Sequence, residues 1–295
     1  MKKCIFEGCA TAIVTPMHPD GSVNEQGFRD LVEQQIIGGI DALVVCGTTG
    51  ESAVLNHEEH LKVIEIAVKQ NAGRVPIIAG TGSNDTAYAV ELSKDALKIG
   101  ADALLMVTPY YNKTSQAGII AHYNYVADRV DAPIIVYNVP SRTGVNIKPE
   151  TYLELSKHPN IVAAKEANGD ISSVLKTMSL CGDDLTIYSG NDDQIVPMMA
   201  LGAKGVISVI SNILPGEFHD LTAACLKGDF KKATEMSIKY ADLMEYMFMD
   251  VNPIPVKEAM NLMGMNMGNC RLPLVPTSDK NREILKNALA KHGLL

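Results

Sequence analysis

Eight short apolar runs recur along the first three quarters of the chain, and their spacing constrains the fold more than any other feature. The runs start 32, 34, 27, 31, 27, 25 and 19 residues apart. They cover residues 10–15, 42–46, 76–80, 103–107, 134–138, 161–165, 186–189 and 205–208. Most intervals between them carry helical periodicity, as in the stretch 28–36. Strands that alternate with helices predict parallel pairing and right-handed crossovers.

The composition of the runs indicates a buried sheet. Leu43-Val44-Val45 is apolar without alternation, which is typical of strands covered on both faces. A partial repeat, with Gly39, Gly100 and Gly202 each shortly before a run, places glycine where helices end. Eight units in about 220 residues predict an α/β fold of the (β/α)8 TIM-barrel type, whose usual size is about 250 residues. A doubly wound open sheet is the alternative, but the G-x-G-x-x-G fingerprint is missing after the first run.

The chain changes character near residue 228. We expect residues 1–228 to form the barrel and residues 229–295 to form an appended helical region. Helical patterns cover 229–249, 254–265 and 279–292, with no strand between them. Eight of the fourteen methionines lie between Met236 and Met267. Their apolar faces predict packing on the barrel or on a partner.

Composition excludes several classes of protein. Of 295 residues, 46% are hydrophobic and 20% charged, which is typical of a globular protein. A net charge of −8 argues against nucleic acid as a partner. No run approaches the roughly 18 apolar residues of a membrane helix, and the start lacks a signal-peptide core, so a cytoplasmic location is expected. Six scattered cysteines without a C-x-x-C motif give no sign of a zinc knuckle or redox pair.

Lys165 is the most unusual residue in the predicted barrel. Barrel enzymes place catalytic groups at the carboxyl ends of their strands, and Lys165 closes the apolar run Ile161-Val162-Ala163-Ala164. Burial disfavours the ammonium form, and a neutral lysine can attack a ketone to form an imine. The alternative is a structural lysine paired with Glu166.

Hydroxyl groups gather at neighbouring strand ends. Tyr137 closes the fifth run, near enough to share a site with Lys165. A phenol with a pKa near 10 shuttles protons when it is hydrogen-bonded to other hydroxyls. Such hydroxyls are supplied by Thr48, Thr49, Tyr110 and Tyr111. Taken singly, each is equally consistent with a buried residue whose hydroxyl is satisfied, but their concentration favours a site.

Two further features could form binding sites: Arg142 for an anion, and the segment His57-Glu58-Glu59-His60 for a metal. Arg142 lies in a loop between Pro140 and Gly144, and its guanidinium suits a carboxylate or phosphate, although a surface arginine is the alternative. The two histidines are three residues apart rather than the four of H-E-x-x-H, and Asn56 with Glu59 resembles a helix cap. We therefore expect no metal, and nothing in the sequence calls for a cofactor.

Several motifs in order resemble one enzyme family. They are Gly47-Thr48-Thr49-Gly50-Glu51, Tyr110-Tyr111-Asn112, Tyr137-Asn138-Val139-Pro140-Ser141-Arg142-Thr143-Gly144 and Lys165-Glu166. Together they look like the dihydrodipicolinate synthase family of pyruvate-dependent Schiff-base lyases and aldolases. The resemblance spans the whole barrel, and the helical extension also fits this family.

The resemblance implies a reaction and residue roles. Pyruvate forms a Schiff base with Lys165 and condenses with L-aspartate 4-semialdehyde to give 4-hydroxy-tetrahydrodipicolinate, in lysine and diaminopimelate biosynthesis. Tyr137 moves protons, with Thr48 and Tyr111 as its relay. The substrates are held by Thr49, Arg142, Gly190 and the main chain at Ile207. Tyr111 reaches the neighbouring subunit's site, which implies a homodimer or homotetramer.

The resemblance also frames two alternatives. Another pyruvate-dependent aldolase, such as a sialic acid lyase or 2-keto-3-deoxygluconate aldolase, is possible in principle, but Arg142 and Thr48-Thr49 favour the synthase because its second substrate carries a carboxylate. A barrel that serves only for binding or regulation is the other alternative.

Family members inhibited by lysine have a site that corresponds here to Ser52, Ala53, His57, His60, Asn84, Tyr88 and Tyr110. Tyr88 replaces a glutamate of that site, so inhibition by lysine should be weak or absent.

Overall fold

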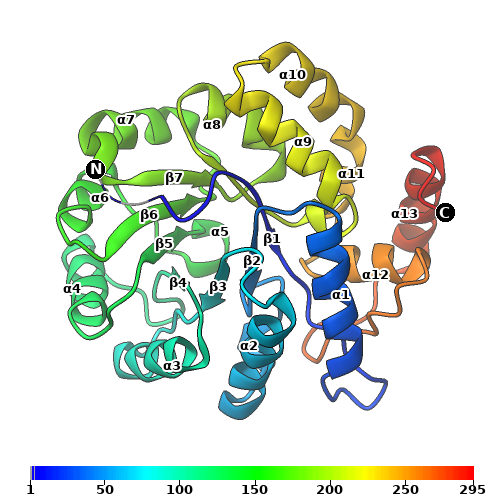
Figure 1. Cartoon of the computed structure of the whole chain (residues 1–295), viewed down its shortest axis with the longest axis horizontal. Coiled ribbons are helices and arrows are strands. Elements are labelled where there is room, and N and C mark those ends of the chain that lie inside the picture. The colour runs from blue at the N-terminus through cyan, green and yellow to red at the C-terminus, as the bar shows by residue number, and fades with distance from the viewer. Residues whose placement is uncertain (1, 3) are drawn as a thin grey trace.

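The computed structural model describes residue 2 and residues 4–295, and it contains a closed barrel of eight parallel strands in chain order. Figure 1 shows the strands at the centre and the helices around them. The strands are β1 (Gly8–Ala12), β2 (Ala42–Val45), β3 (Ile77–Gly80), β4 (Ala103–Val107), β5 (Ile134–Asn138), β6 (Ile161–Glu166), β7 (Thr186–Ser189) and β8 (Gly205–Ser208). The predicted TIM barrel is confirmed, and the open sheet is excluded because β1 pairs with both β2 and β8.

Helices follow the strands and cover the outside of the barrel. The α-helices are α1 (Glu25–Ile37), α2 (His57–Asn71), α3 (Thr86–Ile99), α4 (Gln116–Ala127), α5 (Pro140–Thr143), α6 (Pro149–Leu155), α7 (Ile171–Cys181), α8 (Ile195–Ala200), α9 (Pro215–Leu226), α10 (Phe230–Lys239), α11 (Ala241–Tyr246), α12 (Ile254–Leu262) and α13 (Asp279–Lys291). Short 3-10 turns lie at η1 (Ser52–Val54), η2 (Gly182–Asp184), η3 (Asp192–Gln194) and η4 (Ile210–Asn212).

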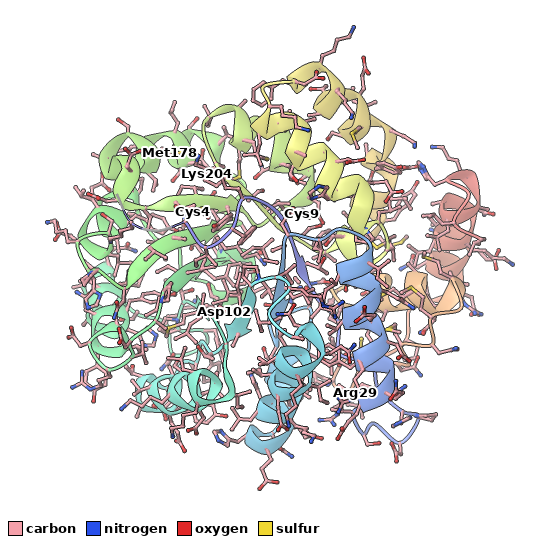
Figure 2. All side chains as sticks on the ribbon, in the orientation of Figure 1. Cys4, Cys9, Arg29, Asp102, Met178 and Lys204 are labelled. Carbon is pink, nitrogen blue, oxygen red and sulfur yellow. The ribbon has the colours of Figure 1, made fainter. Side chains whose placement is uncertain are left out.

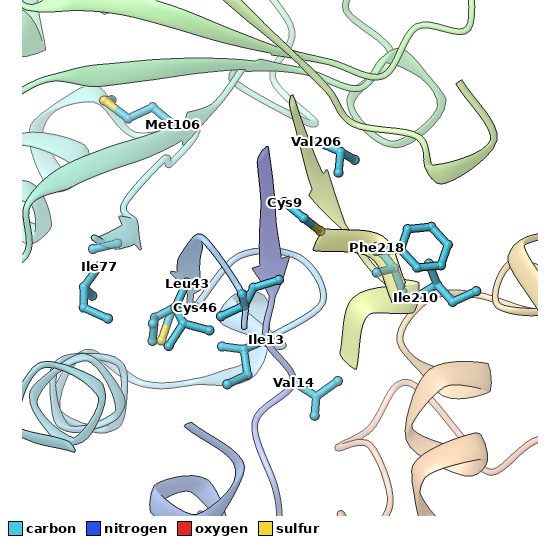
Figure 3. Packing of buried hydrophobic residues seen from close by; sticks show 14 of the residues in the cluster. Cys9, Ile13, Val14, Leu43, Cys46, Ile77, Met106, Val206, Ile210 and Phe218 are labelled. Atoms are coloured by element: carbon cyan, nitrogen blue, oxygen red, sulfur yellow. The ribbon is translucent and has the colours of Figure 1, made fainter. Parts of the chain in front are cut away.

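Two buried layers follow from strand alternation. One lies between strands and helices, and Figure 3 shows part of it, with Cys9 of β1 and Val206 of β8 near Phe218 of α9. The other fills the barrel interior and includes Ile135, Tyr137 and Ala163. Because side chains alternate between the two faces of a strand, this parity decides which strand-end residues face the site.

The repeated Gly-x-Asp segments have a shared structural role. Gly39 and Gly100 adopt φ of 86° and 113°, a left-handed conformation that ends the preceding helix. The carboxylates that follow bond to the adjacent strand: Asp41 accepts from the Cys9 amide and Asp102 from the Ile77 amide, each at 2.8 Å. Figure 2 labels Cys9, in β1, and Asp102, directly before β4. The repeat therefore fixes strand pairing as well as chain reversal.

Two predicted boundaries were wrong. The first strand was expected at residues 10–15 but runs from Gly8 to Ala12, because the Val14 amide donates instead to the Asn212 side chain, at 3.1 Å. The single helix expected over 229–249 is broken between α10 and α11 at Tyr240, whose buried ring lies 6.2 Å from that of Phe218. The other seven strands match their predicted runs to within one residue at either end.

The chain ends lie at opposite sides of the barrel. The N-terminal segment crosses the barrel before it enters β1 (Figure 1), and Phe6 stacks on Tyr188 of β7 with ring centroids 4.2 Å apart. In the same view, the C-terminal helices α12 and α13 lie on the side of α1 and α11, farther from the strands. Among the described residues, the helices are too short or too polar for any of them to cross a bilayer.

Candidate active site

Lys165 lies inside the barrel at the end of β6. Its residue is 5% exposed, and it has the same strand parity as Ala163, which belongs to the interior layer. In the sheet it pairs with Tyr137 of β5, and its Nζ lies 4.3 Å from the centroid of the Tyr137 ring. An amine in this position is enclosed by an apolar wall and a phenol.

Glu166 points to the other face of the same strand. Its carboxylate accepts from the Tyr152 hydroxyl at 2.8 Å, from the Asn138 side chain at 2.9 and 3.1 Å, and from the Asn168 amide at 2.9 Å. Burial raises the pKa of Glu166 to about 7. Lys165 is thus not a structural lysine paired with Glu166, because the two side chains lie on opposite sides of the sheet.

The environment of Lys165 favours its neutral form. Burial lowers the pKa of Lys165 to about 8; the nearby charge of Asp192 acts in the opposite direction, and that of Arg142 lowers the pKa further. With this pKa, roughly a tenth of the amine is unprotonated at pH 7, which is far more than for an ordinary lysine. This is the property that a nucleophilic lysine requires.

Asp192 is a residue that the sequence analysis did not single out. It is buried in η3, and its Oδ2 accepts from the amides of Val209 and Ile210 at 3.1 and 3.0 Å. Its Oδ1 is also buried and has no hydrogen-bond partner within the part of the chain that the structure describes. Burial raises the pKa of Asp192, and the charge of Lys165 opposes that rise. No sequence signal separated it from an ordinary acidic residue after a strand.

Tyr137 and Thr48 meet at the bottom of the site. Both line a small cavity of about 30 Å³ formed by the ends of β2, β3, β4 and β5. Burial raises the pKa of Tyr137, while the Arg142 charge and a hydrogen bond with the Thr48 hydroxyl lower it. The phenol therefore stays protonated at neutral pH, and the Thr48 hydroxyl on the same cavity is a group that can pass a proton onward.

A larger cavity of about 350 Å³ shares Thr48 with the small one, but neither Lys165 nor Tyr137 is among its lining residues. Thr48 and Arg142 line it, and Arg142 is fixed by a bond from its Nη2 to the main-chain oxygen of Asn252 at 3.1 Å. The rest of its guanidinium is free for a ligand within the described structure, since no other side-chain partner is found there. A cation at the mouth of such a cavity suits a carboxylate.

Asn252 was also missed by the sequence analysis, because it lies in the C-terminal region. Its Nδ2 donates to the Thr49 hydroxyl at 3.0 Å, and its main-chain oxygen holds Arg142. Its Oδ1 is buried without a partner among the described residues. Asn252 therefore joins two predicted substrate-binding residues that come from different strand ends.

Gly190 and Ile207 lie where neighbouring backbone segments pack closely. A Cβ at Gly190 would lie 2.7 Å from that of Ala167 and 3.1 Å from the Glu166 oxygen, so only glycine fits there without displacement. Ile207 is buried in β8 and pairs with Ala10 of β1, with the parity of the interior layer.

Tyr111 is not brought to the site of its own chain. Its residue is 92% exposed, and its φ of 68° is in the left-handed region that non-glycine residues rarely adopt. Tyr110 lies beside it and lines the 350 Å³ cavity. The single chain thus provides the other predicted relay residues but leaves Tyr111 projecting outward.

The predicted lysine-inhibitor residues are largely brought together. The same cavity is lined by Ser52, Ala53, His60, Tyr88 and Tyr110. His57 contacts Tyr88, with its Nδ1 3.3 Å from the Tyr88 hydroxyl. Asn84 does not line this cavity; its main-chain oxygen accepts from Asn112 at 2.9 Å. Burial lowers the pKa of His60 to about 4, and its Nε2 lies 2.8 Å from the Gly80 oxygen.

One group of described residues has the composition of a metal site. His57, Glu91 and Asp95 place one ligand atom each within 4.8 Å of one another on α2 and α3. Glu91 is exposed, and Asp95 is already paired with Lys98 at 2.7 Å. His60 is not part of this group; its Nε2 lies 2.8 Å from the main-chain oxygen of Gly80.

Comparison with known proteins gives a consistent result. The sequence matches the Dihydrodipicolinate synthetase family over residues 5–292. It is 54% identical over 292 residues to the 4-hydroxy-tetrahydrodipicolinate synthase of Thermoanaerobacter pseudethanolicus, covering 99% of this chain and 98% of that relative. The protein of the same name from Caldicellulosiruptor saccharolyticus is 53% identical over 290 residues, with 98% of each chain covered.

Solved structures agree with the sequence matches. Dihydrodipicolinate synthase from Thermotoga maritima is similar with a TM-score of 0.97 at 43% identity, covering 99% of this chain and 100% of that one. A monomeric dihydrodipicolinate synthase variant is similar with a TM-score of 0.96 at 43% identity, covering 99% and 98%. The likeness thus extends over the barrel and the C-terminal helices together.

Proposed function

The chain belongs to the dihydrodipicolinate synthetase family, and on that premise we propose how its residues carry out the family's reaction. It is a lyase that condenses pyruvate with L-aspartate 4-semialdehyde to give 4-hydroxy-tetrahydrodipicolinate, a step of lysine and diaminopimelate biosynthesis. The observation that carries the residue assignment is the enclosed amine of Lys165, whose pKa is lowered to about 8 beside the Tyr137 ring.

Lys165 is the nucleophile. Its neutral amine attacks the C2 carbonyl of pyruvate, and water leaves as the iminium forms. A proton then leaves the methyl group, and the carbon of the resulting enamine bonds to the aldehyde carbon of the second substrate. The amino group of that substrate attacks the iminium carbon, the ring closes, and the amine of Lys165 is released.

Tyr137 donates and accepts the protons of these steps. Its phenol is protonated at neutral pH because burial raises its pKa, and the Lys165 Nζ lies over its ring, 4.3 Å from the centroid. Thr48 shares its cavity and forms the next link of the relay. General acid–base catalysis by a positioned group of this kind contributes about 10²- to 10⁴-fold.

Tyr111 completes the relay in a neighbouring subunit. The support is its 92% exposure and its uncommon backbone conformation, which hold the ring away from its own barrel. The assembly that follows is a homodimer, or a homotetramer made from two such pairs. The division into a barrel of residues 1–228 and a helical region of residues 229–295 belongs to the same proposal.

The substrate carboxylates are bound by residues from several strand ends. Thr49 and the main chain at Ile207 bind the pyruvate carboxylate, and Gly190 allows the backbone to lie close to the substrate. Arg142 binds the carboxylate of the semialdehyde; the support is that its guanidinium lies close enough for its charge to lower the pKa of both Lys165 and Tyr137. A sugar aldolase of the same family has no such carboxylate to bind in its second substrate, so Arg142 favours the synthase over that alternative.

Borohydride trapping tests the proposal. Reduction in the presence of pyruvate should convert the imine to a stable secondary amine and increase the mass of the protein. Assays that pair pyruvate with aspartate semialdehyde or with a sugar aldehyde should show turnover with the first. A protein that stays unmodified would instead support a binding or regulatory role for the barrel.

The residues that correspond to the lysine-inhibitor site form a weak site at most. Tyr88 meets His57 where a carboxylate would face the inhibitor's ammonium, and a phenol provides no counter-charge. Lysine should therefore inhibit this enzyme weakly or not at all.

A further inference from the structure

A buried ion pair connects the C-terminal region to the loop after β2. The Nζ of Lys257 in α12 lies 2.9 Å from Oε1 of Glu51, and the two side chains are 2% and 1% exposed. Glu51 lies two residues after Thr49, with Gly50 between them. The pair therefore joins the helical extension to the turn that carries two of the proposed site residues.

Both partners are fully satisfied. Lys257 uses its three donors on Glu51 and on the main-chain oxygens of Thr15 and Asn269, at 3.1 and 3.0 Å. The second carboxylate oxygen of Glu51 accepts from the Arg271 amide at 2.9 Å. Removal of one member of such a pair leaves a buried charge uncompensated, which ties the pair to one arrangement of its surroundings.

The turn itself depends on this anchorage. Glu51 has a φ of 59°, which costs free energy for a residue with a side chain. Its amide donates to the Thr48 oxygen at 3.1 Å, and the Gly50 oxygen accepts from the Thr15 hydroxyl at 2.7 Å. Lys257 thus holds the end of the turn through Glu51 and the segment that follows β1 through the main-chain oxygen of Thr15.

We propose that the Glu51–Lys257 pair is a positioning device that sets the Thr48–Thr49 turn for pyruvate. This inference rests on the proposed function, because it assumes that Thr49 binds the pyruvate carboxylate and that Thr48 serves the proton relay. Neither Glu51 nor Lys257 touches the substrate in this account. Their part is to prevent the small displacements that lower the rate of a reaction between oriented groups.

Two single variants test it in the full-length protein. Lys257→Met leaves a buried carboxylate unpaired, and Glu51→Gln keeps the shape of the side chain while removing its charge. Both should raise KM for pyruvate and slow borohydride trapping, by on the order of tenfold to a hundredfold for Lys257→Met and less for Glu51→Gln. Arg282→Met is the matched control: it removes an exposed ion pair with Glu258 in the same C-terminal region, and KM should not change.

The readouts separate positioning from stability. A purely structural pair would lower the melting temperature and leave kcat and KM of the folded protein unchanged. Folded Glu51→Gln or Lys257→Met with wild-type KM and trapping rate would overturn the inference, and if Lys257→Met does not fold, Glu51→Gln decides. Failure of the wild-type protein to trap pyruvate would count against the proposed function itself, which distinguishes the two.

Discussion

The barrel and the helical region beyond residue 228 contribute to the site in different ways. Lys165, Tyr137 and Thr48 come from the ends of barrel strands and carry the groups that we propose to react. Asn252 and Lys257 come from the C-terminal region and bond to the residues that surround the reaction. The difference indicates that the barrel supplies chemistry and the extension supplies geometry.

That division predicts how variants from the two regions should differ. Changes in the barrel groups should reduce the chemical steps. Changes in the extension should alter substrate affinity and orientation while covalent chemistry continues.

The largest effect is expected at Lys165. Lys165→Met removes the amine and should abolish nearly all turnover while the circular dichroism spectrum stays that of the wild type. Lys204→Met is the control, since the Lys204 side chain forms an exposed ion pair with Glu7, away from the barrel interior. Substantial residual turnover in Lys165→Met would contradict the nucleophilic role.

Tyr111→Phe should reduce turnover by about 10²-fold if its hydroxyl belongs to the relay. Because Tyr111 and Lys165 of one site are proposed to come from different chains, mixing Tyr111→Phe with Lys165→Ala subunits should restore part of the activity. Steady-state assays of the reassembled mixture measure this. Absence of recovery in a verified mixed oligomer would place Tyr111 outside the neighbouring site.

Asn252→Ala should lower kcat/KM by about tenfold, which corresponds to the loss of one hydrogen bond to Thr49 at about 1.4 kcal/mol. The change should fall mainly on KM, because the reacting groups remain in place. Borohydride trapping at saturating pyruvate should proceed at close to the wild-type rate. A trapping rate as low as that of a Lys165 variant would contradict the assignment of chemistry to the barrel and of positioning to the C-terminal region.

Asp192→Asn should shift the pH dependence of trapping. Only the neutral amine attacks, so the rate rises with pH through the pKa of Lys165, about 8. Asp192 raises that pKa, and removal of its charge should lower it and move the rising limb to lower pH. Asp193→Asn, at the exposed neighbour, should leave the limb in place. If the trapping rate of Asp192→Asn rose at higher pH than that of the wild type, the claim that Asp192 raises the pKa of Lys165 would be contradicted.

Tyr88→Glu has the smallest expected effect and concerns regulation only. The new carboxylate beside His57 supplies a counter-charge for an ammonium group, so inhibition by added lysine should become stronger. Tyr125→Glu, on exposed α4, is the control for a new surface charge. Equal lysine inhibition in Tyr88→Glu and the wild type would remove Tyr88 as the determinant.

Sequence reasoning was most successful where the pattern is local. Lysine at the end of an apolar strand is conspicuous, and the parity of β5 and β6 then places Tyr137 beside it. The boundaries of β4, β5, β7 and β8 were predicted without error because turn residues surround each run. The end of β1 was not, because a side chain from residue 212 takes over its hydrogen bonding.

The contributions of the C-terminal region could not be predicted in this way. Asn252 and Thr49 are 203 residues apart in the chain, and Lys257 and Glu51 are 206 apart. A helical pattern indicates which face is apolar but not which distant turn a polar residue will meet. Asp192 was missed for a different reason: acidic residues after strands are common, and only its burial and unpaired Oδ1 set it apart.

A crystal structure of the protein soaked in pyruvate tests the central claim most directly. Continuous electron density is expected from the Lys165 Nζ to C2 of the keto acid, with the carboxylate at Thr49. Density joined to another side chain, or an unbound keto acid beside an unmodified Lys165, would contradict it.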